Sequence, residues 1–146
     1  MQKSNLDHLV VHADGGCLNN GNANGSGVVT CYGSFRVDAY GKDNAWELAK
    51  HQKLDFPEHH TVNEAEYDSL IQSLIYLRDL EVRMNTKLNV LINIDSRLVF
   101  TQLAGTAKCK APNLTMMYAQ AHQLLDSLGY DFHWISGDEM KAVLGH

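Results

Sequence analysis

Short apolar segments separated by turn-forming residues fill the first part of the sequence. Residues 9–14 are apolar and rich in valine, which predicts a buried strand that ends at Asp14, in front of a Gly-Gly pair. The Asn- and Gly-rich residues 18–26 predict a loop. A second strand is expected over residues 27–32 and a weaker third over residues 47–56. Such runs are typical of an antiparallel meander.

The period of the pattern changes after residue 62. Apolar side chains recur at helical spacing from Asn63 to Leu80, which predicts an amphipathic helix that packs on the sheet. Strands followed by alternating strands and helices predict an α/β domain with a mixed sheet. The later elements are expected at residues 88–94 (strand), 96–103 (helix), 112–128 (helix), 130–135 (strand) and 138–145 (short helix).

Composition narrows the class of protein. The 146 residues are 45% hydrophobic with two prolines, which predicts one folded domain over residues 1–146. The apolar runs are too short to span a membrane, and the N-terminus resembles a strand more than a signal peptide. Cys17, Cys31 and Cys109 are odd in number and form no CxxC motif, so free thiols in a reducing cytoplasm are expected. The net charge of −5 argues against a nucleic-acid partner unless metal-binding carboxylates account for part of it.

Asp14, Glu66 and Asp95 are the candidate ligands of a metal site. Asp14 and Asp95 each end an apolar strand, and ligand sites in open α/β sheets gather at the carboxyl ends of strands. Glu66 precedes Leu70 by about one helical turn, so it lies on or beside the face that packs on the sheet. Three acids aimed at one point repel unless a cation lies between them, and Mg²⁺ or Mn²⁺ binds oxygen ligands. Two such ions can promote hydrolysis of a phosphodiester.

Each carboxylate also has a purely structural interpretation. Asp14 followed by two glycines is typical of a turn. Glu66 together with Asn63 fits a helix capping box. Asp95 or Ser96 could be the N-cap of the next helix. The three together are harder to explain by local structure than any one of them alone.

These residues lie within segments that resemble type 1 ribonuclease H. Residues 13–29 (ADGGCLNNGNANGSGVV) resemble the first motif of that family, an Asp-Gly pair before a polar, Gly-rich loop. Residues 61–74 (TVNEAEYDSLIQSL) resemble the first-helix motif, in which a threonine precedes the metal-binding glutamate by five residues. Residues 88–103 (LNVLINIDSRLVFTQL) resemble the third motif, whose aspartate follows a hydrophobic strand.

Two further segments extend the resemblance over nearly the whole chain. Residues 108–125 (KCKAPNLTMMYAQAHQLL) resemble the form of the family that lacks an extra basic helix. Residues 132–140 (FHWISGDEM) resemble the last strand and the loop toward the fourth metal ligand. The resemblance implies a five-stranded mixed sheet of order 3-2-1-4-5 flanked by helices, with the first three strands antiparallel. It also implies an endonuclease that cuts the RNA strand of RNA–DNA hybrids with two Mg²⁺ or Mn²⁺ ions, leaving 5′-phosphate and 3′-hydroxyl ends.

Family members recognise the RNA strand through its 2′-hydroxyl groups in the minor groove. The positions that match this task are Gly15, Asn63 and Glu66, and more loosely Cys17 and Asn20. Lys108 and Lys110 lie where contacts to DNA phosphates would be useful, although an ordinary solvated loop is an equal alternative. We expect a monomer that binds the hybrid and no membrane.

Two departures from the family pattern stand out. The usual Thr-Asn-Asn is replaced by Thr61-Val62-Asn63, which removes one polar contact. The position of the fourth carboxylate is occupied by Leu144, two residues before the end of the sequence. We expect His146 to take its place, because it is the nearest side chain that can bind a metal; its imidazole would favour Mn²⁺ over Mg²⁺. There are three alternatives to the imidazole. The terminal carboxylate of His146 could bind the metal, or Asp138 could, although Asp138 could instead cap the last helix; the third alternative is that the site has no fourth ligand.

Other function classes remain open at this point. A resolvase or exonuclease of the same superfamily would use similar acids. A nucleic-acid-binding module that has weakened or lost catalysis would explain the missing fourth carboxylate. A small-molecule domain is disfavoured, because the glycines of residues 21–27 match no phosphate-binding motif.

Overall fold

The computed structural model describes residues 1–18 and 29–145. The sequence forms five strands and four α-helices in these residues, preceded by a short 3-10 turn at Lys3–Asn5. The strands are β1 (Leu6–Leu18), β2 (Thr30–Gly41), β3 (Trp46–Phe56), β4 (Asn89–Ile94) and β5 (Gly129–Trp134). The helices are α1 (Val62–Met84), α2 (Arg97–Leu103), α3 (Pro112–Asp126) and α4 (Gly137–Leu144).

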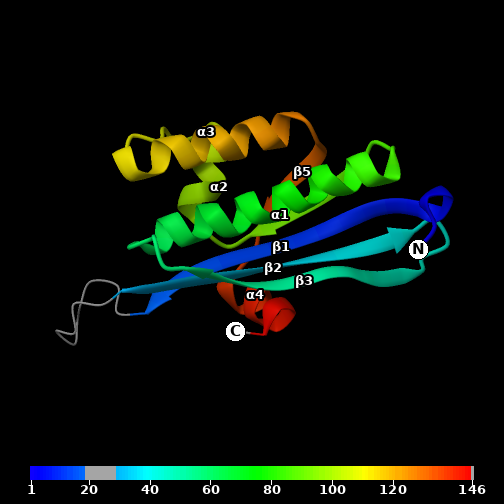
Figure 1. The fold of residues 1–146 in the computed structure, drawn as a ribbon, viewed down its shortest axis with the longest axis horizontal. Coiled ribbons are helices and arrows are strands. Elements are labelled where there is room, and N and C mark those ends of the chain that lie inside the picture. The colour runs from blue at the N-terminus through cyan, green and yellow to red at the C-terminus, as the bar shows by residue number, and fades with distance from the viewer. Residues whose placement is uncertain (19–28, 146) are drawn as a thin grey trace.

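The strands form one mixed sheet of order β3-β2-β1-β4-β5. The pairs β1–β2 and β2–β3 are antiparallel, whereas β1–β4 and β4–β5 are parallel. Helices α1, α2 and α3 lie on one face of the sheet and α4 lies on the other (Figure 1). The predicted architecture and strand order are therefore confirmed.

The core lies between the sheet and the long helix α1. Leu9 and Val11 of β1 and Phe35 of β2 are at most 1% exposed and face Leu70 and Leu74 of α1, which are fully buried. Burial of apolar surface contributes roughly 25 cal/mol per Å², so this layer supplies most of the driving force for folding. It also fixes how α1 lies across β1.

Strand β1 does not end at Asp14 as predicted. Its pairing with β4 covers only residues 9–12, but its pairing with β2 continues to Leu18. The glycines after Asp14 are part of the strand. A Cβ atom at Gly15 would lie 2.3 Å from the carbonyl carbon of Ala65, so this glycine allows α1 to touch the strand and does not form a turn.

Strand β2 extends well beyond the predicted end at residue 32. Buried Phe35 and Val37 alternate with the polar side chains of Arg36 and Asp38, which is the period of a strand with one face on the core. Arg36 and Asp38 form an ion pair of 3.0 Å on the opposite face. The polar side chains on this face of β2 therefore pair with each other within the strand.

The prediction of three free thiols is wrong for two of them. The β1–β2 register places Cys17 directly opposite Cys31, and the two form a disulfide. Cys109, between α2 and α3, is a free cysteine. The 14-residue separation in sequence says nothing about this pairing, because strand register creates it.

No helix within residues 1–18 and 29–145 combines the length and the apolar character needed to cross a membrane.

Candidate metal centre

Asp14, Glu66 and Asp95 meet at one edge of the sheet. Each offers a carboxylate oxygen, and the three oxygens lie within 4.8 Å of one another. Asp14 lies just beyond the segment of β1 that pairs with β4, and Asp95 directly follows the last residue of β4. Because β1 and β4 run parallel, both acids reach the same end of the sheet. Glu66 joins them from the beginning of α1, as the spacing of the motifs predicts.

The N-terminus of α1 is capped without Glu66. Thr61 is the N-cap, and its hydroxyl accepts a hydrogen bond of 3.2 Å from the backbone N–H of Glu64. The Glu64 carboxylate in turn accepts a 3.0 Å bond from the backbone N–H of Thr61. The alternative interpretation of Glu66 as part of a capping box with Asn63 is therefore wrong, because the helix starts earlier than the apolar period indicated. The Thr-x-x-Glu signature at residues 61–64 was present in the sequence and would have identified it.

The two aspartates are also not required as caps or turns. The hydroxyl of Ser96 accepts a 3.2 Å hydrogen bond from the backbone N–H of Val99, so Ser96 is the N-cap of α2 and Asp95 is not. Asp14 lies in extended, paired backbone, where its Oδ1 accepts a 2.9 Å bond from the N–H of Gly15. The structural interpretations of the three acids do not account for their convergence.

The proximity of the three carboxylates changes the protonation of Glu66. Burial, and next the negative charge of Asp14, raise the pKa of the Glu66 carboxyl well above its ordinary value of 4.5. A hydrogen bond with Asp14 and the charge of Asp95 act in the same direction. A divalent cation would relieve this repulsion, and an all-oxygen donor set is the kind that Mg²⁺ or Mn²⁺ binds. The residues present therefore fit such an ion.

The connection from β5 to α4 lies against Asp95. Trp134 donates its indole N–H to the backbone carbonyl of Asp95 over 2.8 Å. The N-cap of α4 is Ser136, whose hydroxyl accepts a 3.1 Å hydrogen bond from Glu139, so Asp138 does not cap this helix. A Cβ atom at Gly137 would lie 3.6 Å from the Asp95 carboxylate. Sequence analysis missed Trp134, because nothing in its local pattern shows that it contacts Asp95. It also missed Ser136, although the Ser-x-x-Glu signature of residues 136–139 indicates a helix N-terminus there.

The candidates for a fourth ligand are not brought into the group by the described residues. Leu144 is 4% exposed and belongs to the apolar side of α4. Asp138 lies in the first turn of α4 and, within residues 1–18 and 29–145, is not among the side chains that share the 4.8 Å group. His146 lies outside the described residues.

The predicted substrate-binding residues lie at different distances from the carboxylates. Gly15 adjoins both Asp14 and the backbone of Glu66, and Asn63 is half-buried in the first turn of α1. Cys17 is two residues beyond Gly15 but is engaged in the disulfide. Lys108 and Lys110 are exposed in the connection between α2 and α3. Asn20 lies outside the described residues.

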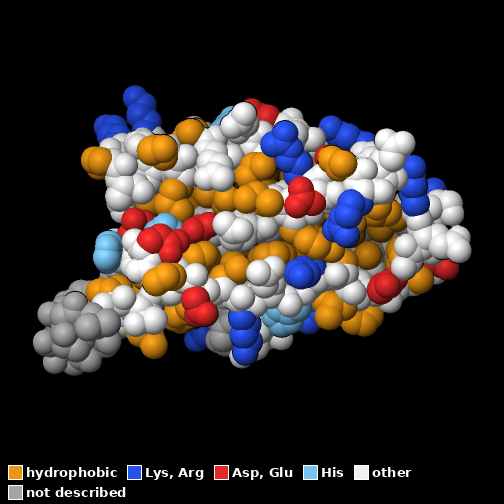
Figure 2. Space-filling model, viewed as in Figure 1, with side chains coloured by type: hydrophobic (Ala, Val, Ile, Leu, Met, Phe, Trp, Pro, Cys, Tyr) orange, Lys and Arg blue, Asp and Glu red, His pale blue; other side chains and the backbone are white. Residues whose placement is uncertain are grey.

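A second group of titratable side chains occupies the other side of the first turns of α1. His59 lies 2.7 Å from Asp68 and 3.6 Å from Glu58, and Asp68 also accepts a hydrogen bond from Gln72. Figure 2 shows acidic and histidine side chains gathered at this end of the molecule. These side chains already satisfy one another, and the group contributes to the start of α1.

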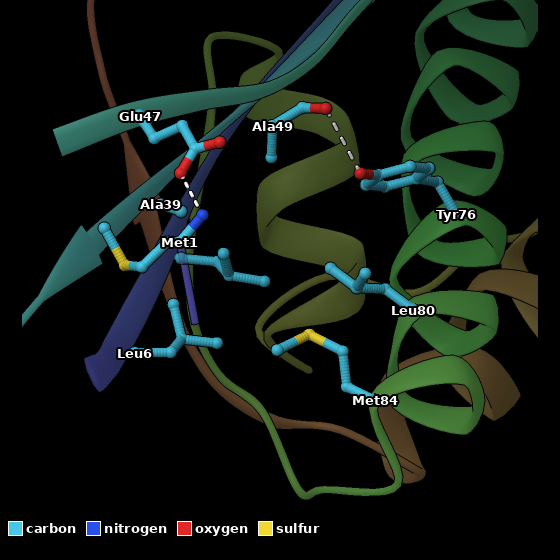
Figure 3. A pocket seen from close by; sticks show the side chains of 9 residues that line it. Met1, Leu6, Ala39, Glu47, Ala49, Tyr76, Leu80 and Met84 are labelled. Atoms are coloured by element: carbon cyan, nitrogen blue, oxygen red, sulfur yellow. Dashed lines mark hydrogen bonds and ion pairs between the residues drawn. The ribbon is translucent and has the colours of Figure 1, made fainter. Parts of the chain in front are cut away.

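An apolar cavity of about 110 Å³ lies near the C-terminal half of α1, away from the carboxylates (Figure 3). Leu6, Leu80 and Met84 line it, and Tyr76 donates a 3.4 Å hydrogen bond to the carbonyl of Ala49 at its rim. Its one carboxylate, that of Glu47, is paired with the N-terminal amino group of the chain. The cavity therefore has little with which to orient a polar substrate, and the carboxylate group remains the candidate site.

Comparison with known proteins identifies a family for most of the chain. The family model described as "Reverse transcriptase-like" matches residues 12–143. A search of curated protein sequences finds no match.

Solved structures share the fold at low sequence identity. The N-terminal ribonuclease H domain of Rv2228c from Mycobacterium tuberculosis, solved as a fusion with maltose-binding protein, is 24% identical with a TM-score of 0.68 over 92% of this chain and 86% of that one. Ribonuclease H1 from Halobacterium salinarum is 19% identical with a TM-score of 0.70, covering 92% and 90%. LC11 ribonuclease H1 in complex with an RNA/DNA hybrid is 19% identical with a TM-score of 0.73, covering 92% and 89%. The chain therefore belongs to the reverse transcriptase-like family and has the fold of type 1 ribonuclease H.

Proposed function

We propose that this protein is an endonuclease that hydrolyses the RNA strand of RNA–DNA hybrids with divalent metal ions. The observation that carries the proposal is the convergence of Asp14, Glu66 and Asp95 at one edge of a ribonuclease H sheet. No cap or turn accounts for it. The structural likeness to LC11 ribonuclease H1, solved with an RNA/DNA hybrid, supports the choice of substrate.

The three carboxylates would hold two Mg²⁺ or Mn²⁺ ions. Bound ions would stabilise charge on the phosphodiester and promote attack by water, and the products would carry 5′-phosphate and 3′-hydroxyl ends. The chain's own contribution is to hold the acids in place. The capping box at Thr61 and Glu64 fixes the start of the helix that carries Glu66. The Trp134 hydrogen bond fixes the carbonyl of Asp95, and the Ser96 cap fixes the backbone of the residue that follows it.

Strand selection requires contacts that distinguish RNA from DNA. Gly15 adjoins Asp14 and the backbone of Glu66, and Asn63 precedes Glu66 by about one turn of α1, so we propose that their polar groups meet the 2′-hydroxyl groups of a strand bound there, together with Glu66. We propose Cys17 and Asn20 as looser contributors, and Lys108 and Lys110 as contacts to DNA phosphates. The disulfide leaves Cys17 without a thiol hydrogen to donate, so its contribution would come from its backbone.

We further propose His146 as the fourth metal ligand. The family pattern places an acid at the position of Leu144, and His146 follows two positions later, outside the described part of the chain. His146→Ala would lower activity if the imidazole binds, whereas a C-terminal extension alone would lower it if the terminal carboxylate binds or if the site is crowded. Asp138→Asn tests the remaining candidate. Full activity in all three variants would show that three carboxylates suffice.

Cleavage of a labelled RNA–DNA hybrid tests the proposed activity. We expect endonucleolytic cleavage of the RNA strand with Mg²⁺ or Mn²⁺, none with excess chelator, and none of single- or double-stranded DNA. Asp14→Asn and Asp95→Asn should each abolish turnover while the protein stays folded, because removing one of several crowded charges relieves repulsion. Cleavage that persists in chelator, or in either variant, would contradict the proposal.

A hybrid-binding module without catalysis is the second candidate, because buried Leu144 occupies the position of the family's fourth acid. It predicts metal-independent binding of the hybrid and no cleavage with either ion.

A further inference from the structure

Arg97 and Trp134 form a pair directly beside Asp95. The Arg97 guanidinium carbon lies 4.8 Å from the centre of the Trp134 ring, within the range of a cation–π interaction. The same indole donates its N–H to the carbonyl of Asp95 over 2.8 Å. One aromatic ring therefore connects a cation to the backbone of a candidate metal ligand.

Helix stability does not explain an arginine at this position. Arg97 is the first residue of α2, where the helix dipole disfavours a positive charge and favours an acid. Within the described ranges, no carboxylate forms an ion pair with the Arg97 side chain. The guanidinium is exposed, and its stacking on Trp134 holds it in place without neutralising it.

The surroundings of Arg97 form an open hollow. Arg97, Phe100, Thr101 and Trp134 line a depression of about 230 Å³ between α2 and β5. Phe100, one of its lining residues, stacks on Phe132 of β5 with ring centres 5.2 Å apart, which packs α2 against β5 beside the hollow. Trp134 is 41% exposed, so part of this residue is open to solvent next to the cation. A planar guanidinium with a fixed orientation is suited to bind a phosphate through two hydrogen bonds.

We propose that Arg97, oriented by Trp134, binds a backbone phosphate of the strand that lies across Asp14, Glu66 and Asp95, adjacent to the phosphodiester that is cut. This inference rests on the proposed function for the identity of that strand. Arg97 follows Asp95 by two residues at the start of α2, and its guanidinium lies over the Trp134 ring at the end of β5. Because Trp134 joins it to Asp95, one of the carboxylates that would hold the phosphodiester to be cut, Arg97 contacts the strand that is cut. It also supplies positive charge in a protein whose net charge is −5.

Affinity for a labelled RNA–DNA hybrid, measured over a series of salt concentrations with Ca²⁺ in place of Mg²⁺, tests the inference. Arg97→Gln should weaken binding about tenfold, as expected for loss of one charged hydrogen-bonding contact. It should also reduce the slope of log affinity against log salt by about one. Arg97→Lys should keep the slope and lose part of the affinity, because lysine keeps the charge without the planar fork.

Arg83→Gln is the matched control. Arg83 also lies over an aromatic ring, 6.0 Å from the centre of Tyr76, but in the last turn of α1, far from the carboxylates. This variant should bind as the wild type does. If Arg97→Gln and Arg83→Gln show the same affinity and the same salt slope, the inference is overturned.

A single uncharged methylphosphonate linkage, moved along the RNA strand one position at a time, locates the contact. At one position near the cleaved linkage, the wild type should bind the modified hybrid more weakly than the unmodified hybrid. Arg97→Gln should bind the two hybrids with nearly the same affinity, because it has already lost this contact. Equal losses in both proteins at every position would overturn the assignment. A wild type that binds with this dependence on Arg97 but never cleaves would contradict the proposed nuclease activity and leave the phosphate contact supported.

Discussion

Gly15 and Ala65 touch backbone to backbone where the strand that carries Asp14 meets the helix that carries Glu66. A Cβ atom at Gly15 would lie 2.3 Å from the carbonyl oxygen of Ala65 and 2.7 Å from the amide nitrogen of Glu66. Ala65 itself and Ala13, two residues before Gly15, are at most 1% exposed, so neither element can move aside without disturbing the core. The distance between two candidate metal ligands thus depends on the absence of one methyl group.

Gly15→Ala should therefore separate β1 from α1 and impair the metal site. Overpacking of this kind costs typically about 1–3 kcal/mol, and we expect activity to fall further than stability because Asp14 and Glu66 move apart. Gly16→Ala is the control. Its Cβ would meet the hydroxyl end of the Tyr32 side chain at 2.8 Å, which can swing away. Urea unfolding and cleavage rates measure both effects; equal behaviour of the two variants would show that the close approach is not needed.

Glu66→Gln should stabilise the metal-free protein, and more so at high pH. The pKa of Glu66 is raised in the folded state, first by burial and then by Asp14, so the stability linked to its protonation is complete below its ordinary pKa of 4.5. That stability is lost as the pH rises toward the raised pKa, whereas glutamine cannot ionise. Each unit of a raised pKa corresponds to about 1.4 kcal/mol, so we expect a gain of at least about 1 kcal/mol at pH 8.

Urea unfolding in chelator at pH 5 and pH 8 measures this difference, with Glu58→Gln, outside the carboxylate group, as the control. Saturating Mg²⁺ should reverse the order, because the wild type gains more from binding the ion. A gain that is the same at both pH values would contradict the predicted coupling.

Reduction of the Cys17–Cys31 disulfide should lower the free energy of unfolding. The bond joins residues 14 apart, and closure of a loop of about this length contributes roughly 3 kcal/mol through the unfolded state. Cys31 also packs on Phe56 and Ala65, next to the start of α1. Thermal unfolding with and without a dithiol reductant measures the change. Cys17→Ala should unfold at the same temperature as the reduced protein. Cys109→Ala is the control and should respond to the reductant as the wild type does. An unfolding temperature of the wild type that does not change with reductant would argue against the bond.

Binding to the hybrid should be weak and should depend only modestly on salt. The net charge is −5, and on the face shown in Figure 2 the Lys and Arg side chains are scattered and form no continuous stripe. The salt slope follows the number of phosphates neutralised, so we expect a slope well below that of proteins with eight or more contacts. Fluorescence anisotropy at roughly 50–200 mM salt measures this slope. A steep slope would contradict the prediction and indicate a continuous basic surface.

The order of apolar and polar residues by itself determined most of the fold. It predicted the helix α1 and strands β4 and β5 to within a few residues, because their periods of burial are long and uninterrupted. It also singled out Asp14, Glu66 and Asp95, since Asp14 and Asp95 each follow a run of apolar residues and Glu66 has the helical spacing of the apolar side chains of its helix. What the sequence left open was whether each acid served a cap or a turn.

Tertiary structure decided the contacts that join distant segments. The β1–β2 register brought Cys17 to Cys31, and the packing of α1 on β1 showed that Gly15 is part of a strand and not a turn. The parallel pairing of β4 and β5 placed Trp134 beside Asp95 and beneath Arg97. Local patterns report burial and period, whereas these relationships depend on which strands pair and in which register, and burial of the whole core sets that choice.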